Sequence, residues 1–180
     1  AQSGVYVSAE ALLRWRSREL GPIPPDEFIP LAEETGLIGM IGNWVIEEAC
    51  RVQRAWLDRG IDLHLSVNVS ARQLLEPGFE YYFREACRVA GVPPEKIGVE
   101  ITGGVLLGDV ESACSVLSSL ADSGVTVSVD DFGVGYSSLN YLRKLPLTFL
   151  KIDRSFVKDC VENPDDATLV RTIIMLAKNL

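Results

Sequence analysis

Five polar side chains of this sequence stand at or near the ends of short β-branched runs. The five are Glu10, Asn68, Glu100, Asp130 and Lys151. Three carboxylates and a carboxamide brought to one place would need a cation among them, and such hard oxygen ligands suit Mg2+ or Mn2+. Asp131 directly follows Asp130 and could serve a second ion. Two ions a few ångströms apart are a device for cleaving phosphodiesters, so the set predicts that chemistry.

Other interpretations stay open at the level of single residues. Any one of the acids alone could equally be a helix cap or a loop hydrogen-bonder, and only their shared position favours function. Lys151 could be an ion-pair partner for the acids, could orient water or phosphate, or could form a Schiff base as in lysine aldolases. The run DDFGVGYSS at 130–138 contains the Asp-Phe-Gly of kinases. No glycine-rich nucleotide loop or catalytic loop accompanies it, which argues against a kinase.

The elements that must position these side chains alternate along the chain. Helical periods that end near Gly60, Gly91 and Gly124 separate β-branched runs, and a last helix is expected over 167–180. The expected strands cover 4–10, 61–70, 97–102, 125–131 and 148–153. Strands that alternate with helices indicate βαβ units and a mostly parallel sheet.

Each expected strand is apolar at one parity and small or polar at the other. In the second strand, for example, Leu65 and Val67 alternate with Ser66 and Asn68. Since strand side chains alternate in direction, the polar set faces away from the covering helices. An open doubly wound sheet, covered on both faces, would be more uniformly apolar. The pattern therefore favours a barrel whose lumen receives the polar set at the C-terminal mouth, although a (β/α)8 barrel typically takes about 250 residues.

Composition excludes several function classes. The 180 residues carry 17 basic and 25 acidic side chains, a formal net charge of -8, which argues against binding a polymeric nucleic acid. Four cysteines without a CxxC pair, and one histidine, argue against zinc and against a disulfide framework. Reduced thiols suit a cytoplasmic domain. No run approaches the roughly 18 apolar residues of a membrane span, so we expect no membrane contact within this chain.

The motifs together resemble the EAL-domain cyclic di-GMP phosphodiesterases. The matching segments are EALLRW at 10–15, GPIPPDEFIP at 21–30, AEETGLI at 32–38, VNVSARQL at 67–74, EIT at 100–102, DDFGVGYSSLNYL at 130–142 and LPLTFLKIDRSFV at 145–157. Their order and spacing match the family over essentially the whole chain.

The resemblance implies a fold, an activity and a set of roles. The fold is an α/β, (β/α)8 TIM-like barrel with one antiparallel strand, and the activity is metal-dependent hydrolysis of cyclic di-GMP to linear pGpG with Mg2+ or Mn2+. The implied metal ligands are Glu10, Asn68, Glu100 and Asp130, with Asp131 at the second metal. Lys151 would contact the attacking water and, with Glu10 and Asp130, form the catalytic set. Arg14 would bind a substrate phosphate, and Leu12 would face the substrate.

The sequence also departs from the family pattern. Gly103 stands where members usually have a glutamate after EIT, which would loosen the DDFG loop and weaken metal binding and dimerisation. The first strand, a later strand with an EGVE glutamate, and a still later glutamine are not in the sequence. We therefore expect residues 1–180 to be one partial EAL domain, truncated at both ends, poorly folded and inactive in isolation.

Two alternatives remain beside the enzyme. A degenerate EAL module would bind cyclic di-GMP or a partner protein without cleavage; the retained ligand set argues against this, and Gly103 argues for it. A lysine-dependent aldolase explains Lys151 but not the acids around it. The resemblance further implies fusion to sensory or cyclase domains and is compatible with a homodimer. Any membrane anchor of the parent protein would lie outside this chain.

Overall fold

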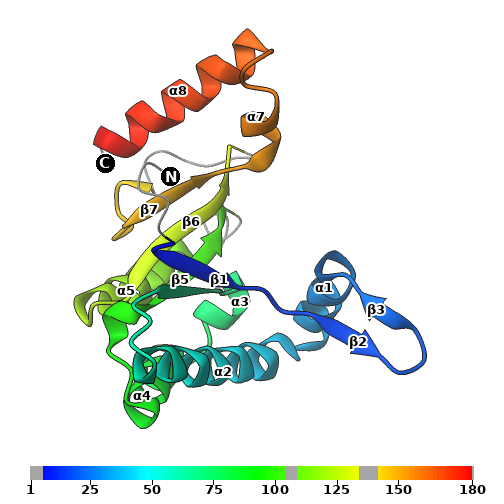
Figure 1. Ribbon diagram of the computed structural model, residues 1–180, viewed down its shortest axis with the longest axis vertical. Coiled ribbons are helices and arrows are strands. Elements are labelled where there is room, and N and C mark those ends of the chain that lie inside the picture. The colour runs from blue at the N-terminus through cyan, green and yellow to red at the C-terminus, as the bar shows by residue number, and fades with distance from the viewer. Residues whose placement is uncertain (1–5, 104–108, 134–141, 180) are drawn as a thin grey trace.

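Five parallel strands form the central sheet of the computed structural model, which describes residues 6–103, 109–133 and 142–179. In spatial order they are β1 (Ser8–Ala11), β4 (His64–Asn68), β5 (Ile97–Thr102), β6 (Thr126–Phe132) and β7 (Phe149–Ile152). The sheet curls into part of a barrel (Figure 1). The predicted parallel α/β fold is thereby confirmed. The start of the first expected strand lies outside the described residues, and the described strands of this sheet do not include the antiparallel one.

One face of the sheet carries the apolar core. The helices α2 (Ile38–Asp58), α4 (Phe79–Ala90) and α5 (Val110–Asp122) cover it. Val67, Val99 and Val127, which are register partners on adjacent strands, are all 0% exposed. These valines belong to the apolar parity of the sequence, so the predicted apolar face is confirmed for β4, β5 and β6. The polar parity is thereby left on the concave face.

The C-terminal part of the chain packs beside the last strand. After β7 come the short α7 (Arg154–Lys158) and the long α8 (Pro164–Asn179), which buries Ile173. The helix expected over 167–180 therefore begins a turn earlier than predicted. Asp153 begins α7 as its N-cap, because its side chain accepts a hydrogen bond from the backbone N–H of Ser155. Two short helices lie between the longer elements: α3 (Ala71–Leu74) and the 3-10 helix η1 (Pro94–Lys96).

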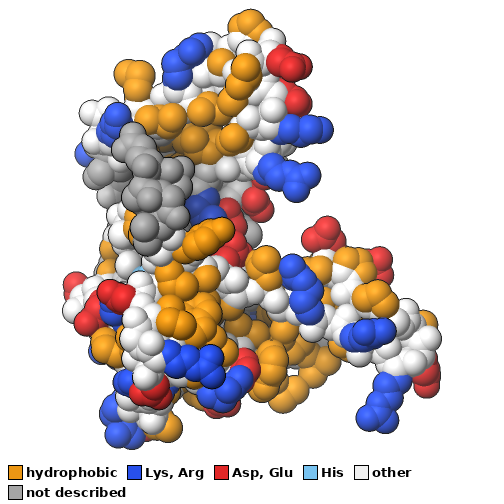
Figure 2. Space-filling view, in the orientation of Figure 1, with side chains coloured by type: hydrophobic (Ala, Val, Ile, Leu, Met, Phe, Trp, Pro, Cys, Tyr) orange, Lys and Arg blue, Asp and Glu red, His pale blue; other side chains and the backbone are white. Residues whose placement is uncertain are grey.

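A small lobe projects from the end of β1 (Figure 1), and the space-filling view shows the same projection (Figure 2). It consists of the antiparallel hairpin β2 (Trp15–Ser17) and β3 (Gly21–Ile23), followed by α1 (Pro25–Thr35). Trp15 packs edge-on against Phe28 with ring centroids 5.6 Å apart. Trp15 is still 45% exposed and Trp44 on α2 is 56% exposed, which is more than is usual for tryptophan.

Two further expectations concern the thiols and the membrane. Cys50 on α2 and Cys87 on α4 are buried with their Sγ atoms 3.8 Å apart, and all four cysteines are free thiols. Among residues 6–103, 109–133 and 142–179, no helix has the combined length and apolar character that a bilayer span requires.

Candidate metal centre

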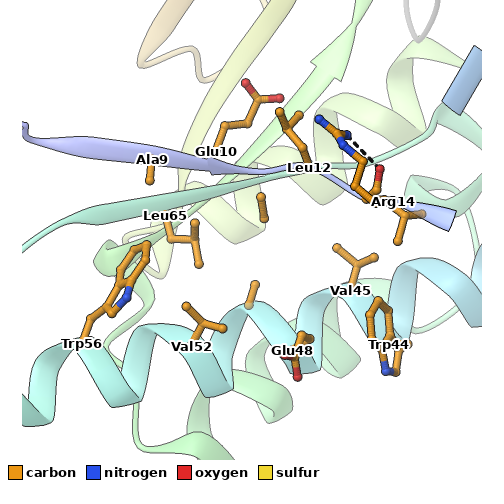
Figure 3. Close-up of a pocket in the computed structure, with 13 residues that line it drawn as sticks. Ala9, Glu10, Leu12, Arg14, Trp44, Val45, Glu48, Val52, Trp56 and Leu65 are labelled. Atoms are coloured by element: carbon orange, nitrogen blue, oxygen red, sulfur yellow. Dashed lines mark hydrogen bonds between the residues drawn. The ribbon is translucent and has the colours of Figure 1, made fainter. Parts of the chain in front are cut away.

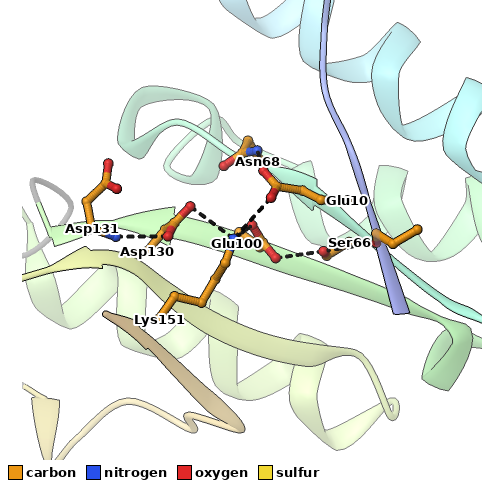
Figure 4. Close-up of polar contacts among 8 residues, drawn as sticks. Glu10, Ser66, Asn68, Glu100, Asp130, Asp131 and Lys151 are labelled. Carbon is orange, nitrogen blue, oxygen red and sulfur yellow. Dashed lines mark hydrogen bonds and ion pairs between the residues drawn. The ribbon is translucent and has the colours of Figure 1, made fainter. Parts of the chain in front are cut away.

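Polar side chains from four strands meet on the concave face of the sheet. Glu10 comes from β1, Glu100 from β5, Asp130 from β6 and Lys151 from β7. Figure 4 shows their side chains converging, although the chain separates the first from the last by 141 positions. Because all of the strands are parallel, their carboxyl ends reach the same rim of the sheet. The parity of the sequence thus predicted which residues the fold brings together.

The three carboxylates come close enough to share one cation. One oxygen from each of Glu10, Glu100 and Asp130 lies within 4.8 Å of the others. The Lys151 ammonium lies among them, with its Nζ 3.2 Å from Glu10 Oε2, 2.6 Å from Glu100 Oε2 and 3.1 Å from Asp130 Oδ2. Like charges at this separation repel strongly unless they are compensated, and the ammonium compensates them in this structure.

Burial and contact with the acids shift the pKa of Lys151 in opposite directions. Burial lowers the pKa of the Lys151 ammonium, but its hydrogen bonds and charge interactions with Glu100, Asp130 and Glu10 outweigh burial and raise the pKa above the ordinary value for lysine. Lys151 is therefore a protonated donor at neutral pH. A Schiff-base nucleophile must instead be a neutral amine, so this environment argues against the aldolase interpretation.

Asn68 belongs to the same cluster. Its Nδ2 donates to Glu10 Oε1 at 2.7 Å, which leaves its carbonyl oxygen as the atom that could bind a metal. The two residues lie on neighbouring parallel strands, β1 and β4. Their contact orients the Glu10 carboxylate from one side while Lys151 holds its other oxygen.

Asp131 does not join this cluster. Its carboxylate points away from Glu100 and Lys151 (Figure 4), and its backbone has a φ of 52°, which is rare outside glycine. Its backbone N–H donates to Asp130 Oδ1 at 2.9 Å. Burial raises the pKa of the Asp131 carboxyl, and the nearby Asp130 and Asp153 carboxylates raise it further. Its role at a second metal stays a prediction.

Leu12 and Arg14 lie next to the cluster rather than in it. They follow β1, and Figure 3 shows their side chains on the same side of the chain as Glu10, facing away from α2. Leu12 is 54% exposed, and Arg14 is exposed, with its Nη1 donating only to the neighbouring Leu13 carbonyl at 2.9 Å. Both also border a cavity of about 530 Å3 between β1 and α2. The guanidinium therefore remains available to a ligand at the rim.

The donor set fits a hard divalent cation. It supplies carboxylate oxygens and one carboxamide oxygen, with no thiolate or imidazole among the described residues of the cluster. This is the ligand chemistry of Mg2+ and Mn2+ rather than of zinc or copper. The cluster is also already arranged around a cationic group, the Lys151 ammonium.

Comparison with known proteins decides the family. A family model described as EAL domain matches residues 1–180. The chain belongs to the EAL domain family. The bifunctional diguanylate cyclase/cyclic di-GMP phosphodiesterase MucR of Pseudomonas aeruginosa is 42% identical to this EAL domain over 181 residues, with 100% of the chain and 26% of MucR covered. The cyclic di-GMP phosphodiesterase PdeR of Escherichia coli is 41% identical over 177 residues, with 98% and 27% covered.

Solved structures agree with this assignment. A cyclic di-GMP complex of the MucR phosphodiesterase superposes on this EAL domain with a TM-score of 0.92 at 42% identity, covering 99% of this chain and 73% of that one. The EAL domain of FimX from Pseudomonas aeruginosa, bound to cyclic di-GMP, gives a TM-score of 0.82 at 27% identity, covering 92% and 66%. The chain spans about a quarter of the length of the two curated relatives, 26% and 27%.

Sequence reasoning missed one polar contact inside the EAL domain. Ser66 Oγ lies 2.6 Å from Glu100 Oε1, and both residues are buried. The alternation of β4 places Ser66 on the polar side, but a serine there looks like a small spacer. Its contact depends on the alignment of β4 with β5, which places Ser66 opposite Gly98, two residues before Glu100.

Proposed function

We propose that this EAL domain hydrolyses cyclic di-GMP to linear pGpG with the help of Mg2+ or Mn2+. The observation that carries the proposal is the convergence of Glu10, Glu100 and Asp130 around Lys151 at the carboxyl rim of the sheet. This rim is where barrel enzymes place their active sites. The relatives named as cyclic di-GMP phosphodiesterases, and the MucR complex with that ligand, support the choice of substrate.

The proposed ligands of the cation are the three carboxylates and the Asn68 carboxamide, with Asp131 at a second ion. When bound, divalent cations supply Lewis acidity that activates water and offsets the phosphodiester charge. An acidic domain could in this way bind an anionic dinucleotide. The specific ion, Mg2+ or Mn2+, is part of the proposal.

The remaining roles belong to the side chains of the chain itself. Lys151, held protonated by the acids around it, would donate to the attacking water or to a phosphate oxygen. Arg14 would bind a substrate phosphate through its planar guanidinium, which matches phosphate oxygens in pairs. Leu12 would pack against the substrate next to that phosphate.

The setting of the domain is also proposed. Free thiols suit a reducing, cytoplasmic compartment. The lengths of the relatives, one of them named as a cyclase and phosphodiesterase, support a parent protein with further sensory or cyclase domains. A homodimer of this EAL domain is also part of the proposal, since membership of the family is compatible with one. Among the described strands, β1 and β7 each pair on one side only, so we expect the 180 residues expressed alone to fold poorly and to be inactive.

A second candidate function rests on Gly103. This glycine directly follows β5, where the family pattern implies a glutamate that braces the DDFG loop. Without that brace, the domain would bind cyclic di-GMP or a partner protein as an effector with little or no cleavage.

One experiment separates the two candidates. The full-length parent protein is incubated with cyclic di-GMP and Mn2+, and the nucleotides are resolved by chromatography. If the domain is a phosphodiesterase, the wild type should produce linear pGpG and the Glu10→Gln variant should produce none. Tight binding of cyclic di-GMP without any product would overturn the enzyme and favour the effector. The same assay on the isolated 180 residues tests their expected inactivity, which robust turnover would refute.

A further inference from the structure

Ser66 lies beneath the acidic cluster rather than among the expected ligands. It stands in the middle of β4, which pairs with β1 on one side and with β5 on the other. Ser66 is 8% exposed, and its hydroxyl oxygen lies 2.6 Å from Glu100 Oε1. Buried polar groups in folded proteins are nearly always hydrogen-bonded, so this contact between a buried hydroxyl and a buried carboxylate belongs to the folded structure.

The direction of this hydrogen bond is settled by the available acceptors. The Ser66 hydroxyl has one proton and two acceptors in reach, Glu100 Oε1 at 2.6 Å and the Ala9 carbonyl oxygen at 3.4 Å. A charged acceptor at the shorter distance gives much the stronger bond. Ser66 therefore donates to Glu100.

Each of the three acids has a donor on both carboxylate oxygens, and Glu100 is the most deeply buried of the three. Ser66 binds its Oε1, while Lys151 binds its Oε2 at 2.6 Å. Its side chain is 6% exposed, against 31% for Glu10 and 22% for Asp130. The terminal torsion of a glutamate is intrinsically broad, so a carboxylate gripped at one oxygen alone can still rotate. Two donors on opposite oxygens fix its plane.

We propose that Ser66 is a positioning residue, which locks the Glu100 carboxylate in the plane that presents Oε2 to the cation site. Groups that orient a metal ligand in this way typically contribute about 10- to 100-fold in metal affinity or activity. The effect on turnover rests on the proposed phosphodiesterase function. The effects on carboxylate orientation and on Mn2+ affinity do not.

The test compares three variants of the full-length protein. Ser66→Ala removes the hydroxyl, and Ser66→Thr retains it with one added methyl group. Ser128→Ala is the matched control, since Ser128 is 5% exposed and is the register partner of Glu100 on β6. Within the described part of the chain, no group forms a hydrogen bond with the Ser128 hydroxyl. Thermal unfolding of each metal-free variant reports whether the fold is retained.

The first readout is Mn2+ affinity, measured from the electron paramagnetic resonance signal of free Mn2+. We expect Ser66→Ala to weaken binding about 10-fold, with Ser66→Thr and Ser128→Ala both close to the wild type. The second readout is the crystal structure of metal-free Ser66→Ala, in which the Glu100 carboxylate should turn while β4 and β5 stay in place. An unturned carboxylate, or a Ser128→Ala loss as large as that of Ser66→Ala, would overturn the proposal.

Turnover of cyclic di-GMP is the third readout. If the wild type hydrolyses it, kcat should fall in Ser66→Ala and recover in Ser66→Thr. If the wild type does not hydrolyse it, the phosphodiesterase function fails, and the orientation of Glu100 in Ser66→Ala still decides the role of Ser66.

Discussion

Lys151 Nζ lies 2.6 Å from Glu100 Oε2, a contact between residues 51 positions apart in the sequence. It joins β7 to β5 across the concave face, and the same ammonium also reaches Glu10 and Asp130. The acids that are proposed to bind a divalent cation thus already surround a monovalent one. Lys151 and a metal ion must then share or compete for the same carboxylates.

That competition makes a prediction for Lys151→Met. Without metal, the three carboxylates lose their counter-charge, and the variant should be about 1–3 kcal/mol less stable than the wild type, toward the lower end because Lys151 is partly exposed. Saturating Mn2+ should raise its melting temperature by more than it raises that of the wild type, since no ammonium competes for the acids. Calorimetric melting with and without Mn2+ measures both effects.

Lys96 provides the control for this prediction. Lys96 pairs with Asp62, which is largely exposed, outside the metal centre. Lys96→Met should change stability by less than about 1 kcal/mol and leave the Mn2+ response unchanged. An equal Mn2+ response in the wild type and Lys151→Met would show that Lys151 does not compete with metal.

Arg14 should act in substrate binding rather than in the chemical step. Its exposed guanidinium lies on the same side of the chain as Glu10 but does not contact the acidic cluster (Figure 3). Arg14→Ala should therefore raise KM for cyclic di-GMP about 10-fold with kcat changed less than about threefold. Arg51→Ala, on α2 and paired with Glu48, is the control and should behave as the wild type. A large loss in kcat at unchanged KM would place Arg14 in the chemical step instead.

Gly98 is required by close packing beneath the acids. A Cβ atom there would lie 2.4 Å from Thr126 Oγ1 and 2.6 Å from His64 Cε1, two side chains that hydrogen-bond each other at 2.8 Å. Gly98→Ala should cost about 1–3 kcal/mol in the free energy of unfolding, measured by urea denaturation. In a Thr126→Ala background the added cost should be smaller, because one of the two clashing groups is gone. Strict additivity of the two substitutions would refute this explanation.

His64 should give the domain a dependence of stability on pH. Burial lowers the pKa of its imidazole below the ordinary value, the charge of Lys96 lowers it further, and that of Glu100 opposes them. As the pH falls through about 6.5, the unfolded chain therefore binds more protons than the folded one. The free energy of unfolding decreases over the same interval.

The single histidine makes this effect easy to isolate. The free energy of unfolding is measured between pH 7.5 and 5.5 for the wild type and for His64→Gln. The variant should lose less stability across this interval than the wild type. Equal losses in the two proteins would mean that His64 titrates alike in the folded and unfolded states.

Strand alternation predicted the convergence of the three acids because direction and order are local properties. Once Glu10, Glu100 and Asp130 were assigned to the polar parity of parallel strands, their meeting at one rim followed. Ser66 could not be assigned a partner in the same way. Its hydrogen bond to Glu100 depends on the register between β4 and β5, which is a tertiary property. The direction of the Asp131 side chain likewise depends on a positive φ, which the residue type alone does not predict.

The projecting lobe was the least predictable part of the fold. The segment from Trp15 to Ile23 has too few alternating residues to indicate its two strands, each of three residues. Trp15 in the lobe and Trp44 on α2 are both partly in solvent, although tryptophan is usually well buried. The helices α4 and α5 end at Ala90 and Asp122, close to Gly91 and Gly124, where their apolar periods predicted an end.

The most direct test of the metal centre is a calorimetric titration of the full-length protein with Mn2+. The wild type should bind Mn2+, and Glu100→Gln should lose most of that affinity while keeping its melting temperature in the absence of metal close to that of the wild type. Cyclic di-GMP hydrolysis should disappear with the binding. Equal Mn2+ affinity in the wild type and Glu100→Gln would contradict a cation site built on these carboxylates.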